Sequence, residues 1–184
     1  MADLQVHAGQ RAKVKWHKFG CPEACGDSVQ GKYQRKLLKD EGKLSRFRDI
    51  LEENELTLSA FAVHGEPLHP DPRIAQPYRE DYLNACRLAE KIGLGRLTLM
   101  AGLPEAGEGG IYPNWVLSAF PTRNLDIIEW QWEKRLIPYW KEQGKVAADH
   151  GITLCFENQI GDMLHSPEKL RRFHEEIGPV AACN

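Results

Sequence analysis

The sequence predicts an α/β fold in which parallel strands alternate with helices. Short apolar segments that end in polar residues recur at 56–64, 97–102, 152–157 and 180–184, and amphipathic stretches lie between them. No segment carries the Asn-Gly or Asp-Gly dipeptide that is typical of a tight β-hairpin. Strands joined through helices form right-handed βα units, so the polar residues that follow the strands should meet at one edge of a parallel sheet.

The first predicted elements are a helix and a strand. Apolar residues three to four positions apart predict a helix at Leu44–Asn54, and the strand Leu56–Val63 follows it. This strand runs into a loop, His64–Asp71, in which prolines and a glycine interrupt regular structure. A second amphipathic helix is predicted at Tyr78–Ile92, with Gly93 as its C-terminal stop.

The middle of the chain contains a strand, a long loop and a long helix. The strand is Arg96–Ala101, and Gly102–Pro121 is a loop rich in glycine and proline. A loop of about 20 residues is uncommon in a compact domain and is more often functional than idle. The helix Leu125–His150 follows, with a bend expected at Pro138.

The last part of the chain repeats this pattern. A short apolar strand, Ile152–Glu157, ends at a carboxylate, and such an acid at the mouth of a core is costly unless a metal or a substrate meets it. The helix Pro167–Ile177 has Ser166 in the N-cap position, and Pro179–Asn184 begins a fourth strand.

Residues 1–43 are interpreted as an N-terminal segment, and residues 44–184 as the main domain. Leu4–His7 alternates apolar and polar residues and is a candidate first strand. Arg11–Arg35 is basic and interrupted by glycines, which predicts an irregular, solvated loop.

The composition excludes several classes of protein. The chain has 184 residues, 42% of them hydrophobic, and a formal net charge of −2. A globular core is therefore expected, and binding to nucleic acid or acidic membranes has no electrostatic support. No apolar run approaches the roughly 18 residues of a membrane span, and Met1–Lys15 lacks the apolar centre of a signal peptide. A cytoplasmic location is predicted.

The five cysteines also favour a reducing compartment. Cys155 and Cys183 lie inside apolar segments, so we interpret them as reduced core residues. Cys21 and Cys25 are spaced like half of a metal clip, but no second pair accompanies them. We therefore interpret them as loop thiols.

Five segments of the chain carry a family pattern. They are Ser-Ala-Phe-Ala-Val-His-Gly-Glu-Pro-Leu-His-Pro-Asp at 59–71, Leu-Ala-Glu-Lys-Ile-Gly at 88–93, Asn-Trp-Val at 114–116, the tryptophan-rich helix segment 130–140 and the strand 152–157. Together they resemble the sugar phosphate isomerase/epimerase family of xylose-isomerase-like TIM barrels, over about residues 44–184. The histidine-proline loop and the tryptophan-rich helix are specific in combination.

The resemblance implies a partial (β/α)8 TIM barrel with about its first four or five βα units. A complete barrel of this kind takes roughly 250 residues. In the family, the last strand seen here leads to an Asp-x-x-His metal-binding motif, which would lie beyond Asn184. The chain is therefore expected to be an incomplete fragment of an enzyme.

The chain departs from the family pattern in two places. The family commonly has Asn where Glu66 stands, and His-Pro-Gly where residues 158–161 read Asn-Gln-Ile-Gly. Gln159 removes an imidazole from the expected pocket. The resemblance therefore leaves the substrate subgroup open.

Glu157 is the strongest candidate for a catalytic residue. The resemblance implies that it transfers protons and binds a divalent metal, Mn²⁺, Mg²⁺ or Co²⁺, whose remaining ligands would lie beyond Asn184. Isomerisation needs a base that removes a proton next to a carbonyl and a cation that stabilises the enediolate charge. Carboxylates are suitable ligands for these ions. The structural alternative is a strand-end glutamate in a surface ion pair.

Three further residues are expected to bind the substrate. The resemblance implies that His64 lines the sugar pocket, that His69 contributes from the same loop, and that Trp115 covers an apolar sugar face with its indole. Their structural alternatives are a hydrogen-bonded imidazole, a rigid turn and a loop anchor. Glu105 and Glu108 are expected to be solvated.

Three functions compete. The first is a metal-dependent isomerase or epimerase for a sugar or sugar phosphate, with no nucleic-acid or membrane partner. The second is a phosphodiesterase similar to the apurinic endonucleases, which share the barrel, but the net negative charge disfavours DNA binding. The third is an inactive half-barrel or binding piece, whose open sheet edges and exposed apolar inner face would promote homo-oligomers.

Overall fold

The computed structural model describes residues 29–116 and 118–183, and it confirms the predicted α/β fold. The strands are β1 (Phe61–Val63), β2 (Arg96–Leu99), β3 (Thr153–Phe156) and β4 (Ala181–Cys183). Among the described residues they form one sheet in the order β1-β2-β3-β4, and every neighbouring pair is parallel. The candidate strand Leu4–His7 and the thiols of Cys21 and Cys25 lie outside the described residues.

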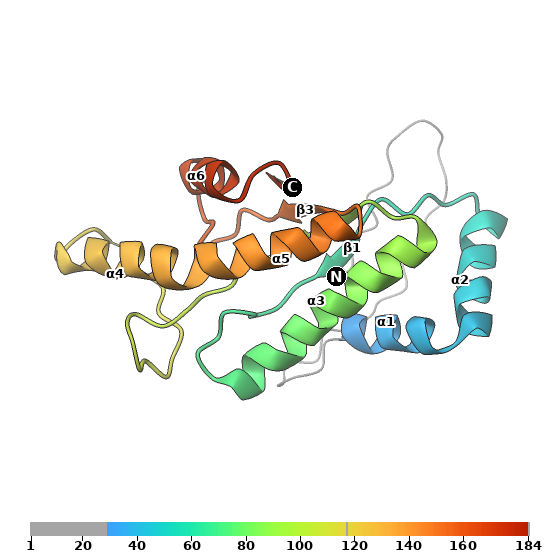
Figure 1. The fold of residues 1–184 in the computed structure, drawn as a ribbon, viewed down its shortest axis with the longest axis horizontal. Helices are drawn as coiled ribbons and strands as arrows, with labels where there is room; N and C mark the ends of the chain where they lie inside the picture. The colour runs from blue at the N-terminus through green and yellow to red at the C-terminus, as the bar shows by residue number, and fades with distance from the viewer. Residues whose placement is uncertain (1–28, 117, 184) are drawn as a thin grey trace.

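Helices connect the strands and pack beside them (Figure 1). They are α1 (Val29–Lys39), α2 (Glu41–Glu53), α3 (Pro72–Ile92), α4 (Arg123–Gln131), the π-helical turn η1 (Trp132–Leu136), α5 (Ile137–Asp149) and α6 (Pro167–Ile177). In Figure 1, α4 and α5 form one long rod, and α1 and α2 lie at the opposite end of the molecule from α4. No helix in the described ranges is long and apolar enough to cross a membrane.

One face of the sheet forms the core against the helices. Leu97 and Leu99 of β2 pair with Leu154 and Phe156 of β3, and all four side chains are at most 1% exposed. Side chains alternate between the two faces of a strand, so intervening residues such as Thr98 point to the opposite face. The long apolar residues of these strands are therefore concentrated on the helix-covered side.

Trp140 of α5 occupies the centre of this core. Its ring centroid lies 4.8 Å from that of Phe156 on β3 and 5.9 Å from that of Tyr82 on α3, and both pairs meet edge to face. Its indole Nε1 donates a hydrogen bond to the Ala101 carbonyl at 3.0 Å. Trp140 thus connects a helix, a strand and a loop while its polar atom is satisfied.

The opposite face of the sheet carries small side chains. Ala62, Thr98, Cys155 and Ala182 form one row across the strands, and the large exposed apolar side chains of the described residues lie on helices and loops. Three of the four side chains in this row are apolar, although they are small, so the exposed apolar inner face stays a prediction. Cys155 is buried as predicted, whereas Cys183 is exposed because it ends an outer strand of the described sheet.

Helix α3 begins six residues before its predicted start at Tyr78. Pro72 occupies its first turn, where a missing N–H costs nothing. The Asp71 side chain caps the helix by accepting a hydrogen bond from the Arg73 amide at 2.9 Å. The predicted stop is confirmed, because Gly93 adopts the left-handed conformation with φ of 74°.

Helix α1 contradicts the prediction that Arg11–Arg35 is an irregular loop throughout. Residues from Val29 onward are helical, and Gly31 lies inside the helix. A methyl group at Gly31 would overlap the carboxyl group of Asp81 on α3, and Arg35 forms an ion pair with the same carboxylate. The glycine that suggested a break instead permits close helix packing.

The helix contains a π-helical turn just before Pro138, and α4 and α5 continue as one rod. Proline has no N–H for the helical ladder and displaces the preceding carbonyl. Just before it, the Ile137 amide donates to the Trp132 carbonyl five residues back, which is the π-helical pattern. The predicted helix Leu125–His150 is therefore divided into α4, η1 and α5.

Replacing Trp140 with alanine should lower the free energy of unfolding by about 3–5 kcal/mol, as large-to-small changes in a core do. Equilibrium unfolding in urea measures this loss. The matched control is Trp130→Ala, because that ring is half-buried and contacts Arg135 at 4.9 Å. It should cost no more than about 1 kcal/mol, and equal losses in the two variants would contradict the central role of Trp140.

Candidate functional site at the carboxyl edge of the sheet

The residues that follow three neighbouring strands form a row at the carboxyl edge of the sheet. His64, Met100 and Glu157 each come one position after the last paired residues of β1, β2 and β3. The Glu157 amide donates to the Leu99 carbonyl at 2.9 Å, so the hydrogen-bonded ladder extends to the glutamate. This is the edge that the βα pattern predicted to collect functional side chains.

His64 and Glu157 are in direct contact across β2. His64 Nε2 lies 3.0 Å from Glu157 Oε1, and the two side chains are 35% and 29% exposed. The contact is thus accessible to a ligand rather than sealed in the core. A carboxylate in this setting can accept a proton, and the imidazole can orient it by a hydrogen bond.

Three side chains form hydrogen bonds with the turn that follows β2, the strand between those that carry His64 and Glu157. This central turn, Ala101–Leu103, follows β2. Its first carbonyl accepts from Trp140 Nε1 at 3.0 Å, its glycine amide donates to Asp162 Oδ2 at 2.8 Å, and its leucine amide donates to Glu66 Oε2 at 3.2 Å. The three partners come from α5, the loop after β3 and the loop after β1.

Neither Asp162 nor Glu66 was predicted as a site residue. Asp162 is 1% exposed, and burial raises its pKa to about 6 although backbone amides act to lower it. Burial, with the nearby Asp162 charge, also raises the pKa of Glu66 to about 6. No local pattern marks Asp162, because its burial depends on how its loop folds over the central turn.

His69 organises its own loop. Its Nδ1 accepts a hydrogen bond from the Asp71 amide at 2.9 Å, directly before helix α3 begins. Within the described part of the chain it makes no hydrogen bond to His64 or Glu157. Substrate binding by His69 remains a prediction.

The long loop after β2 is anchored at its base by Gln131 of α4. This side chain is 1% exposed. Its amide nitrogen donates to the carbonyls of Pro104, Glu105 and Asn114 at 3.0, 3.1 and 2.8 Å. A helix side chain thus substitutes for the regular backbone pairing that the loop lacks.

Glu105 is buried, so the prediction that it is solvated is wrong. Its side chain forms an ion pair with Arg135 of η1, with an Nη2–Oε1 distance of 2.7 Å. The loop folds back over it, since a methyl group at Gly110 would lie 2.7 Å from the Glu105 Cβ atom. Glu108, at the outer part of the same loop, is exposed as predicted.

Trp115 lines a hollow that includes neither His64 nor Glu157. That hollow also includes Asp162 and His165, from the segment after β3. The indole is 36% exposed. Trp115 therefore lies beside the loop that follows β3. Its binding to a sugar remains a prediction.

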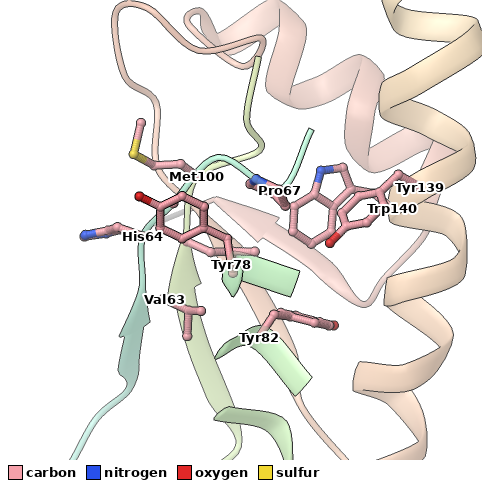
Figure 2. A pocket seen from close by; sticks show the side chains of 10 residues that line it. Val63, His64, Pro67, Tyr78, Tyr82, Met100, Tyr139 and Trp140 are labelled. Carbon is pink, nitrogen blue, oxygen red and sulfur yellow. The ribbon is translucent and has the colours of Figure 1, made fainter. Parts of the chain in front are cut away.

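A small apolar hollow lies behind His64 (Figure 2). Its walls include Tyr78, Tyr82, Met100, Tyr139 and Trp140. In Figure 2, the Tyr78 ring stands between His64 on one side and Tyr139 with Trp140 on the other. The space holds about one water molecule, so a sugar would have to bind on the exposed side of His64. Tyr78 is a wall residue that the sequence did not reveal.

The described residues do not by themselves complete a metal site. No group of three His, Cys, Asp or Glu side chains among them could hold a metal ion. Glu157 offers one carboxylate and His64 one nitrogen, whereas Mg²⁺ requires octahedral coordination in which waters supply several ligands. A ligand role for Glu157 therefore depends on further groups.

The parallel sheet, its covering helices and the strand-end row define the class of protein as part of an α/β barrel. The chain matches the family of xylose isomerase-like TIM barrels over residues 14–182 and belongs to that family. The resemblance seen in the sequence is thereby confirmed. The family includes sugar isomerases and epimerases as well as endonuclease-like enzymes.

A curated relative matches most of this chain. The uncharacterized protein YfiH of Bacillus subtilis (strain 168) is 32% identical over 152 residues, which are 81% of this chain and 48% of that protein. The chain thus spans about half the length of the curated relative it matches.

Two solved structures are similar to this chain. A xylose isomerase-like TIM barrel protein from Mycobacterium smegmatis, crystallised in complex with magnesium, is similar with a TM-score of 0.51 at 16% identity, over 85% of this chain and 55% of that one. A xylose isomerase domain protein from Planctomyces limnophilus has a TM-score of 0.45 at 13% identity, over 76% of this chain and 46% of that one. The match to the first supports a partial barrel.

Replacing Gly65 with alanine should lower the free energy of unfolding by about 1–3 kcal/mol, the usual cost of overpacking. The new methyl group would overlap the ring of Tyr78. Combining it with Tyr78→Leu should remove much of that cost, which a double-mutant cycle of urea unfolding measures. Gly107→Ala is the control, because a Cβ atom there would meet nothing within 4 Å. Strictly additive effects of the two changes would contradict the predicted contact.

Proposed function

We propose that the complete protein is an isomerase or epimerase for a sugar or sugar phosphate, with Glu157 as its proton-transfer base. The observation that carries this proposal is the 3.0 Å contact between Glu157 and His64 at the carboxyl edge of the sheet. Enzymes with (β/α)8 barrels place their catalytic residues at this edge. Membership of the xylose isomerase-like family supports the same class of reaction.

Glu157 would act on the C–H bond beside the substrate carbonyl. Its carboxylate removes the proton while the carbonyl oxygen gains negative charge. In an isomerase Glu157 then returns the proton to the neighbouring carbon while the hydroxyl proton moves from one oxygen to the other. In an epimerase a second acid, outside the described residues, would supply a proton on the opposite face of the same carbon. The partial exposure of the Glu157 side chain supports this role, because a substrate can reach the carboxylate.

His64 would orient the catalytic carboxylate and bind a sugar oxygen. Its Nε2 contact with Glu157 restricts the direction in which the carboxylate faces. His69, from the same loop, and Trp115, whose indole matches an apolar sugar face, complete the proposed substrate-binding set.

A divalent cation, Mn²⁺, Mg²⁺ or Co²⁺, is the proposed cofactor. Glu157 would be one ligand, and the others would lie outside the described residues. When bound, such a cation holds the substrate oxygens and offsets the negative charge that develops on them. The solved relative from Mycobacterium smegmatis, which contains magnesium, supports this assignment.

We propose that the protein is cytoplasmic and binds a small molecule. We propose that it binds neither nucleic acid nor a membrane. The net charge of −2 offers no general attraction to polyanions. Cys86 and Cys155 are buried as free thiols, which suits a reducing compartment.

We also propose that the 184-residue chain forms homo-oligomers through the edges of its sheet. Strands β1 and β4 are the outermost of the described strands. Unpaired strand edges expose backbone donors and acceptors, and these favour pairing with another chain.

Glu157→Gln should lower the exchange of substrate C–H protons with solvent deuterium by at least about 100-fold, because amides are not bases and general-base catalysis contributes about that much or more. The exchange is followed by proton NMR with a panel of sugars and sugar phosphates plus Mg²⁺ or Mn²⁺. The 184-residue chain is assayed beside a chimera that adds the remaining half of the Bacillus subtilis relative.

Glu175→Gln is the matched control, because that side chain is exposed on α6. It should exchange protons at the rate of the unchanged protein. Absence of exchange with every substrate in both forms would contradict the isomerase proposal. Cleavage of abasic DNA instead would support the endonuclease-like alternative.

The mass of the 184-residue chain in static light scattering should rise with concentration as its sheet edges pair. Cys183→Lys should reduce this rise, because a charge at the exposed end of β4 disfavours edge pairing. Cys183→Ser is the control that separates edge pairing from disulfide formation. A monodisperse monomer at every concentration would contradict the proposed homo-oligomer.

A further inference from the structure

Two carboxylates that the proposed reaction does not use meet adjacent amides of the central turn, Ala101–Leu103. Asp162 Oδ2 accepts from the glycine amide at 2.8 Å, and Glu66 Oε2 accepts from the leucine amide at 3.2 Å. The two acids come from different loops, one after β3 and one after β1. The two carboxyl groups are close enough for the charge of Asp162 to act, after burial, to raise the pKa of Glu66.

The two acids differ in how many hydrogen bonds they accept. Both oxygens of Asp162 accept backbone N–H groups, since Oδ1 also accepts from the Leu164 amide at 2.9 Å. Among the described residues, only one oxygen of Glu66 accepts a hydrogen bond. Amide donors favour the charged form of a carboxylate. The hydrogen bonds of Asp162 therefore stabilise its charged form more than the single hydrogen bond of Glu66 does.

We propose that Glu66 and Asp162 form a pair of positioning residues that fixes the relative placement of the strand-end loops carrying His64 and Glu157. Glu66 stands two residues after His64, and Asp162 stands five residues after Glu157. Both loops are bonded to the same short turn, so a shift of either carboxylate changes the separation of the two site residues. The link between this placement and catalysis rests on the proposed function, whereas the hydrogen bonding of the loops does not.

The titratable groups around the pair affect its charge. Besides the two acids, the described ones are His165, whose Nδ1 lies 3.0 Å from the Asp162 carbonyl, and Lys169, which lines the same hollow as Asp162. Burial is the main cause that raises the pKa of each acid to about 6. Because these folded-state values exceed the ordinary ones, the pair contributes stability that is complete below about pH 4 and is lost as the pH rises through about 6.

Glu66→Gln tests this arrangement. The amide keeps an oxygen for the leucine amide of the central turn but carries no charge at any pH. The ratio of its folding equilibrium constant to that of the unchanged chain should be about ten times larger at pH 8 than at pH 5, because one pKa unit corresponds to a factor of ten. Urea unfolding of the 184-residue chain at the two pH values measures the change.

Two further variants separate charge from hydrogen bonding. Glu66→Ala leaves an amide without its acceptor and should be less stable than the unchanged chain at pH 5. Asp162→Asn places an NH₂ group against a backbone N–H, so it should be less stable at both pH values. Because Asp162→Asn could unfold the chain, Glu66→Gln carries the conclusion.

The positioning role has its own spectroscopic measurement. In nitrogen–proton NMR spectra, the amides of Gly102 and Leu103 should titrate near pH 6 in the unchanged chain. Glu66→Ala should also move the amide resonances of Gly65 and Asn158, which flank the site residues, and Glu66→Gln should restore them. Rescue by the neutral isostere distinguishes the positioning of loops from a general loss of structure.

The same pH dependence in Glu66→Gln and the unchanged chain would overturn the proposal, as would turn amides that do not titrate. These measurements need no turnover. A chain that behaves as expected here but shows no proton exchange with sugars would refute the isomerase and leave the carboxylate pair in place. Proton exchange with sugars, combined with turn amides that do not titrate, would support the isomerase and refute the carboxylate pair.

Discussion

The hydrogen bonding of the central turn, Ala101–Leu103, is the constraint on which the carboxyl edge of the sheet depends. A turn after a buried strand leaves backbone groups that no neighbouring strand can pair, and an unpaired buried amide or carbonyl costs free energy. Trp140, Asp162 and Glu66 satisfy these groups from three different elements. The same bonds therefore complete the turn and join the loops that carry the site residues.

The long rod of α4, η1 and α5 joins the core to this edge. The π-helical turn before Pro138 accommodates a proline inside a helix that would otherwise lose its register. On one side of the turn, Gln131 anchors the long loop through three carbonyls, and on the other Trp140 packs on the sheet. One helix thus positions both the loop over the site and the strand beneath it.

The contact between His64 and Glu157 shows why a parallel sheet suits proton transfer. The two residues are 93 positions apart in the chain, but parallel strands end at one edge, so both side chains arrive there together. The edge is exposed enough for a ligand, and the side chains on the inner face of the sheet are small. Chemistry is thereby separated from the core, which Leu97, Leu154 and the aromatic rings fill on the other face.

The sequence by itself determined the order of strands and helices and the candidate pair His64 and Glu157, because apolar periodicity and strand-end polarity are local properties. Only the tertiary structure decided the rest. Helix α1 forms because Gly31 can approach Asp81 on another helix. Glu105 and Asp162 are buried by loops that fold over them, and no local pattern records which backbone amide a distant carboxylate will meet. Long-range packing therefore selected the groups that hold the site together.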